Sequence, residues 1–63
     1  MKTWNILYKA NADVQSSRNV QADRVKIDGG YAMFFKIEKD GNSTLVLLIN
    51  MFNIENIELQ QPK

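Results

Sequence analysis

Five apolar residues follow one another without a polar break in the last third of this chain: Leu45, Val46, Leu47, Leu48 and Ile49. A strand with one solvated face alternates apolar and polar residues, and a surface helix has polar residues on the side that faces water. A run that is apolar throughout is typical of a strand covered on both faces. The chain has only 63 residues, so the run raises the question of what covers its second face.

The length of the chain limits how much of its own surface it can bury. We expect residues 1–63 to form one domain, with residues 60–63 as a polar tail. A domain of this size buries only about 60% of the surface that its unfolded chain exposes, and small domains commonly add a disulfide, a metal or a partner subunit. The sequence has no cysteine and no histidine, which excludes disulfides and removes the most common zinc ligands. A partner surface is the remaining means of stabilisation.

The overall composition is that of a folded protein, with 44% hydrophobic and 24% charged residues. A formal net charge of +1 creates no strong field toward nucleic acid or membranes. The apolar residues near the N-terminus are interrupted by Asn5 and Lys9, which does not fit the core of a signal peptide. No apolar run approaches the ~20 residues of a membrane span. We therefore expect a soluble, cytoplasmic protein.

Apolar residues recur with a period of two in the first half of the chain. Residues 2–10 are predicted to form a strand with Trp4, Ile6 and Tyr8 facing the core, and the polar residues 11–18 to form a loop.

The apolar residues of the next segment, 19–28, change phase in its middle. Before Asp23 they occupy even positions, and after Arg24 they occupy odd positions. One regular strand would place one of these sets on the wrong face. We expect either two short strands or one bent strand here, with a turn or a bulge at Asp23-Arg24.

Two glycine-containing turns separate the remaining strands. Gly29-Gly30 predicts a tight hairpin, because glycine adopts positive φ without a steric penalty, and residues 40–42 predict a second turn. Residues 31–38 and 44–51 are predicted strands, residues 53–56 a single 3-10 turn, and residues 57–59 a short last strand. In the first of these strands, the residues expected to face the core are Tyr31, Met33, Phe35 and Ile37.

The predicted fold is all-β: a small antiparallel meander of four to five strands, forming an SH3-like barrel or a strongly bent sheet, with one short 3-10 turn near residues 53–56. A central strand of a curled sheet would bury both of its faces. Alternatively, one face is covered by a second copy or by a target protein. Phe34, Val46 and Leu48 are the residues expected in an exposed apolar patch.

Catalytic residues are not evident in this sequence. Covalent catalysis needs a nucleophile with an adjacent base, and without histidine that base would have to be a lysine or a carboxylate with a shifted pKa. The seven acidic residues are scattered singly, and no segment has the dense oxygen ligands of a calcium loop. We expect neither an enzyme nor a bound metal or cofactor.

Binding of single-stranded nucleic acid is an alternative, because small barrels bind strands with aromatic rings and a basic groove. Two aromatic residues would stack with bases and four cations would contact phosphates: Tyr31, Phe34, Arg18, Arg24, Lys26 and Lys36. The low net charge argues against this interpretation.

The segment from Val20 to Leu59, VQADRVKIDGGYAMFFKIEKDGNSTLVLLINMFNIENIEL, resembles small all-β proteins of phages and mobile elements. The shared features are a short strand, a V-x-I strand, a glycine turn, an aromatic strand, a second turn and an aliphatic strand. The ending here is Ile54, Ile57 and Leu59. Such proteins often act by binding, as inhibitors or modulators of host defence proteins. The resemblance implies that class of function and transfers no site residues.

The leading hypothesis is a non-catalytic protein-binding module that works alone or as a homodimer. This hypothesis rests on the apolar run of residues 45–49, which is apolar on both faces, in a small domain that has no other evident means of stabilisation. The predicted contact surface contains Phe34, Val46 and Leu48, with Lys36 and Glu38 at its rim.

Overall fold

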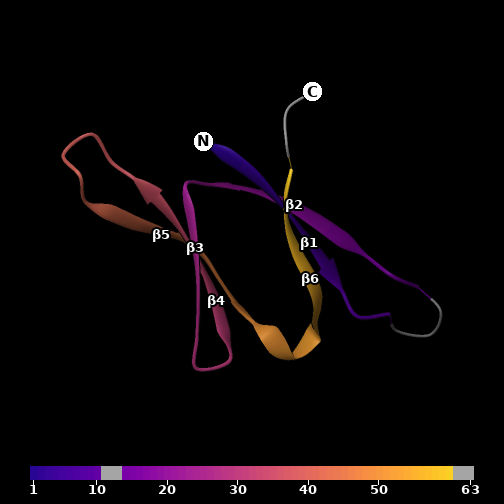
Figure 1. The fold of residues 1–63 in the computed structure, drawn as a ribbon. Coiled ribbons are helices and arrows are strands. Elements are labelled where there is room, and N and C mark those ends of the chain that lie inside the picture. Colours follow the sequence, from indigo (N-terminus) through magenta and orange to yellow (C-terminus); the bar gives the residue numbers. More distant parts are fainter. Residues whose placement is uncertain (11–13, 61–63) are drawn as a thin grey trace.

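The computed structural model describes residues 1–10 and 14–60 and shows an all-β protein with two three-stranded antiparallel sheets (Figure 1). Within these residues the only helix is a short 3-10 helix, η1. Most of the predicted tail and part of the predicted loop at 11–18 lie outside the described residues. The elements are β1 Lys2–Tyr8, β2 Ser17–Ala22, β3 Arg24–Asp28, β4 Tyr31–Ile37, β5 Ser43–Asn50, η1 Met51–Asn53 and β6 Ile54–Gln60.

The two sheets have the strand orders β2-β1-β6 and β3-β4-β5. The chain passes from one sheet to the other twice, once between β2 and β3 and once through η1 (Figure 1). The sheets do not close into a barrel, so the open one of the two predicted architectures is the one observed. The number of strands is six rather than four to five, because residues 17–28 form two strands that belong to different sheets.

The phase change at Asp23 is this passage between sheets: of the two expected alternatives, the structure has two short strands and not one bent strand. The backbone N–H of Asp23 donates to the carbonyl oxygen of Phe35 at 2.8 Å. The Asp23 carboxylate accepts a hydrogen bond from the backbone N–H of Ile37 at 2.7 Å. One residue thus bonds twice to the end of β4, which fixes the point at which the chain leaves the first sheet.

The glycine turns are confirmed. Gly29 and Gly30 have φ values of 59° and 82°, and Asp28 pairs with Tyr31 across a two-residue hairpin. The 3-10 helix begins two residues earlier than predicted, because the Asn50 side chain accepts a hydrogen bond from the backbone N–H of Phe52 at 2.8 Å and caps the helix there. The last strand is correspondingly longer than the predicted residues 57–59.

One small core joins the two sheets. Trp4, Ile6 and Tyr8 of β1 face it as predicted: Ile6 is fully buried, and the Trp4 ring lies edge-on to the Phe34 ring with 6.3 Å between centroids. The buried residues in the described part of the chain are Ile6, Val20, Ala22, Ala32, Phe34 and Ile54.

The predicted phase of β4 is wrong. Ala32 and Phe34 face the core and are fully buried. Through the glycine turn, Phe34 pairs with Val25, which packs against the core, and Ala32 pairs with Ile27, which is 59% exposed. The four residues that were expected to face the core lie on the opposite face of β4: Tyr31, Met33, Phe35 and Ile37.

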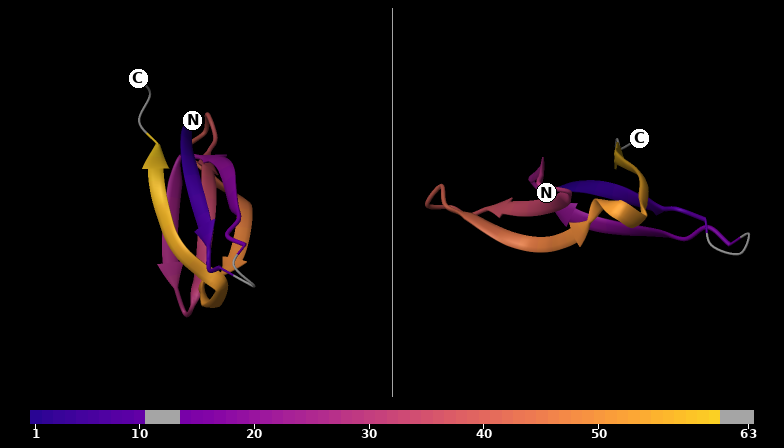
Figure 2. Two further views of the ribbon diagram at one scale, coloured as in Figure 1. Left: turned by 90° about the vertical axis from the view of Figure 1, so that its right-hand side faces the viewer. Right: turned by 90° about the horizontal axis from the view of Figure 1, so that it is seen from below.

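The molecule is thin for its mass. Its Cα atoms extend over 45 × 33 × 12 Å (Figure 2), and the smallest extent is little more than the ~10 Å that separates two packed sheets. The solvent-accessible surface is 4856 Å², against about 4,200 Å² expected for a compact monomer of this mass. The extra exposed surface follows from the flat shape.

Candidate interaction surface

The outer face of the β3-β4-β5 sheet, turned away from the core, has a continuous group of apolar side chains. Alternation along β4 and pairing with β5 place these residues on one side. We call this surface the apolar face and define it by Tyr31, Met33, Phe35, Ile37, Leu45 and Leu48.

The side chains of the apolar face are accessible to solvent. Leu48 is 51% exposed, Leu45 49% and Tyr31 46%, while Met33 and Phe35 are half-buried. Single exposed apolar residues are normal in soluble proteins, but a contiguous group across neighbouring strands indicates an interaction site.

The apolar run in β5 divides between the core and this face. Leu47 pairs with Phe34 and Ile49 pairs with Ala32, so both face the core. Leu48 pairs with Met33 on the outer face. The register shifts by one residue between Phe34 and Phe35, which makes Val46 an extra residue in a bulge. The exposure of Leu48 shows that nothing in residues 1–10 and 14–60 covers the second side of the run.

The outer face of the β2-β1-β6 sheet has the opposite character. Its register positions are Thr3, Asn5, Leu7, Ser17, Asn19, Gln21, Asn56, Glu58 and Gln60, and we call this surface the polar face. Leu7 is the only apolar residue among them. Asn5 donates a hydrogen bond from Nδ2 to Oδ1 of Asn19 at 3.0 Å across the strand pair.

Of the three apolar residues predicted to bind a partner, two are exposed and one is buried. Leu48 lies on the apolar face, and Val46, at the bulge, is 45% exposed. Phe34 is fully buried, so the prediction that it is part of an exposed patch is wrong. The physical reason is its pairing with Val25 and Leu47, which face the core together with it.

Lys36 and Glu38, predicted as the rim of the surface, lie near the β4–β5 turn. The Lys36 ammonium group is 4.0 Å from Oε1 of Glu38, and both side chains are exposed. The Glu38 carboxylate also accepts a hydrogen bond from the Thr44 hydroxyl at 3.2 Å. Along β4, Lys36 alternates with Phe35 and Ile37, so it points away from the apolar face.

The residues predicted for nucleic-acid binding are only partly brought together. Tyr31, Arg24 and Lys26 share the outer face of the second sheet, because Arg24 pairs with Phe35 and Lys26 with Met33. The other three residues are elsewhere: Phe34 in the core, Lys36 on the opposite side of β4, and Arg18 in the first sheet.

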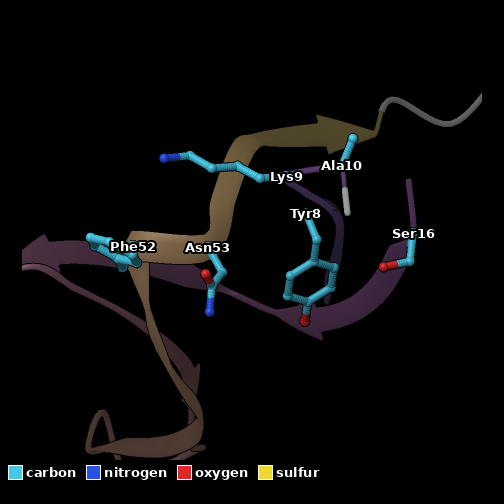
Figure 3. Close-up of a pocket in the computed structure, with 6 residues that line it drawn as sticks. All are labelled: Tyr8, Lys9, Ala10, Ser16, Phe52 and Asn53. Atoms are coloured by element: carbon cyan, nitrogen blue, oxygen red, sulfur yellow. The ribbon is translucent and has the colours of Figure 1, made fainter. Parts of the chain in front are cut away.

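A separate shallow hollow lies where β1 ends beside η1 (Figure 3). The Lys9 ammonium group is 5.7 Å from the centroid of the Phe52 ring, and Phe52 is 78% exposed. Figure 3 shows Ser16 and Lys9 at opposite ends of the hollow, so its lining has no paired nucleophile and base. The lining residues are Tyr8, Lys9, Ala10, Ser16, Phe52 and Asn53.

The described ranges have neither a cluster of metal ligands nor a membrane-spanning helix. No group of three or more histidine, cysteine, aspartate or glutamate residues is placed to hold a metal ion. The helix η1, three residues long, falls far short of a membrane span, and residues 1–10 and 14–60 contain no helix that could cross one.

Sequence reasoning missed most of the apolar face, because it assigned Met33 and Phe35 to the core. The register of the glycine hairpin was the available signal. A two-residue turn at Gly29-Gly30 pairs Met33 with Lys26 and Phe35 with Arg24. Two charged residues on that face indicate that it is the outer one.

The chain matches no protein-family model, and no curated protein or solved structure is significantly similar to it. The resemblance to phage and mobile-element proteins therefore stays a prediction.

Proposed function

We propose that this protein is a non-catalytic protein-binding module and that the apolar face is its contact surface. The observation that supports this proposal is the contrast between the two outer faces. The polar face has one apolar residue, Leu7, whereas the apolar face has six that adjoin across β4 and β5. Removing such a group from water is the main source of free energy in most protein association.

Protein is a better fit than nucleic acid for this face. Binding to nucleic acid depends on cations that neutralise phosphates. The apolar face is bordered on β3 by Arg24 and Lys26, and the third residue of that border is the acidic Asp28. Aromatic and methionine side chains with few charges are typical of the centre of a protein interface.

The more specific role implied by the resemblance is inhibition or modulation of a host defence protein. The resemblance transfers no site residues, so it does not assign this role to a particular surface.

Site-specific photo-crosslinking tests the proposal. A benzophenone amino acid is placed at position 48, on the apolar face, in the cells that make the protein. The same group at position 21 is the matched control, because Gln21 and Leu48 are both exposed residues on edge strands, on the two opposite outer faces. We expect a discrete protein adduct from position 48 and none from position 21.

Two results would contradict the proposal. Equal adducts from both positions would mean that the contacts are unspecific. Adducts from position 48 that are removed by nuclease would favour the nucleic-acid alternative, whose affinity would also decrease steeply with salt.

A further inference from the structure

We propose that the occupant of the apolar face is a second copy of this chain, related by a twofold axis that lies along the row Lys26–Met33–Leu48. This inference rests on the proposed function and names the partner. The sequence has no cysteine and therefore no disulfide to stabilise its small core. A second copy bound to the apolar face would stabilise the protein by burying these side chains.

Three rows of paired residues cross all three strands on the outer face of the β3-β4-β5 sheet, and Ile37, which pairs with Ser43, lies beyond them. The middle row is Lys26, Met33 and Leu48. The row on the side of the glycine turn is Asp28, Tyr31 and Asn50, and the row on the other side is Arg24, Phe35 and Leu45.

A twofold axis along the middle row exchanges the two outer rows. Asp28 of one copy then lies opposite Arg24 of the other, and this ion pair occurs twice. Tyr31 lies opposite Phe35, also twice, which allows an aromatic contact. An interface between identical copies must be self-complementary in this way.

The middle row meets itself. Met33, on the central strand, contacts its own equivalent at the centre of the interface, and Leu48 does so on the edge strand β5. Lys26 also lies opposite its equivalent, but it is exposed on the other edge strand, and its long side chain extends the ammonium group beyond the contact into solvent. The row thus has an apolar residue at its centre and its one charge at the rim, which is the usual arrangement of an interface.

Charge reversal tests the twofold arrangement. The molar mass of the protein is measured by sedimentation equilibrium over a wide range of concentrations, for wild type, Arg24→Asp, Asp28→Arg and the double variant. Each single variant places like charges opposite each other twice, and we expect its dimer dissociation constant to rise roughly ten-fold. The double variant restores both ion pairs and is expected to return close to the wild-type value. Circular dichroism shows that each variant is folded.

The other outcomes overturn the inference in distinguishable ways. A wild-type monomer at all concentrations would exclude the second copy, while crosslinks to a different protein at position 48 would leave the proposed function in place. A dimer in which the double variant is as weak as the single variants would exclude this axis. A dimer that Leu48→Asp does not weaken would exclude the apolar face as the dimer contact, and the absence of any protein crosslink at position 48 would then contradict the proposed function as well.

Discussion

The two outer faces of this protein are built from the same kind of three-stranded sheet but have opposite surfaces. On the β2-β1-β6 sheet, side chains such as Asn5 and Asn19 bond to each other across the strands in contact with solvent. On the β3-β4-β5 sheet, Leu45 and Leu48 present half of their surface to solvent without such a partner. This difference is the basis of the proposal that a partner covers the second face and not the first.

The core lies between the two sheets, so substitutions on either outer face are compared with a substitution in the core. The largest expected effect comes from adjacent phenylalanines of β4, one on each side of the sheet. Phe34→Ala leaves a cavity in the core that the described residues form and is expected to cost about 3–5 kcal/mol, which is much of the stability of a small domain. Phe35→Ala is expected to cost far less. Thermal unfolding followed by circular dichroism, at a concentration that keeps the protein monomeric, measures the stability of both variants. Equal losses would contradict the assignment of Phe34 to the core and Phe35 to the apolar face.

The second effect concerns assembly rather than folding. Leu48→Asp places a carboxylate on the apolar face, and desolvating this charge opposes any contact there. We expect the dimer dissociation constant to rise by more than about a hundred-fold, because the substitution affects the interface twice. Gln21→Asp adds the same charge to the polar face and is expected to leave assembly unchanged. Sedimentation equilibrium measures both variants, and a parallel effect of Gln21→Asp would remove the contrast between the faces.

A smaller effect is expected at Asp23, where the chain passes between the sheets. Asp23→Ala removes the carboxylate that accepts a hydrogen bond from the Ile37 backbone N–H. Because that group remains accessible to water, the expected loss of unfolding free energy is about 1 kcal/mol. Urea denaturation at a concentration that keeps the protein monomeric measures the loss, and Asp28→Ala, at the other end of β3, is the matched control. A loss of several kcal/mol would contradict the prediction and would mean that the hydrogen bond from Ile37 to Asp23 contributes far more to stability than an exposed hydrogen bond does.

The smallest effect is expected on the polar face. Asn5→Ala removes the exposed hydrogen bond to Asn19, and exposed substitutions of this kind change stability by no more than about 0.5 kcal/mol. The same urea experiment measures it. A change in the dimer dissociation constant would show that the polar face also takes part in assembly.

The turns and the approximate positions of most strands along the chain could be predicted because their signals are local, whereas the division into two sheets, with β6 beside β1, could not. Gly29-Gly30 and the turn at residues 40–42 can be read from a few neighbouring residues. The phase of β4 was predicted wrongly because large side chains such as Tyr31 and Phe35 were given more weight than the register of the hairpin, which was itself predictable.

Other features depend on contacts between distant parts of the chain. The bulge at Val46 arises from the register between β4 and β5, and no residue type marks it. The passage at Asp23 depends on its bonds to β4. The apolar face was only partly predictable: Leu48 could be inferred from the apolar run, while Met33 and Phe35 require the correct phase.

Methyl NMR with a soluble paramagnetic probe tests most directly whether the apolar face is covered in the assembled protein. The leucines give an internal comparison, since Leu48 lies on the apolar face, Leu7 on the polar face and Leu47 towards the core. At high protein concentration we predict that the Leu48 methyl groups are as protected from the probe as those of Leu47, and that Leu7 is less protected. On dilution, Leu48 should become the most accessible of the three. If Leu48 is more accessible than Leu7 at every concentration, the apolar face is not covered by a second copy and the account of the assembled protein is wrong.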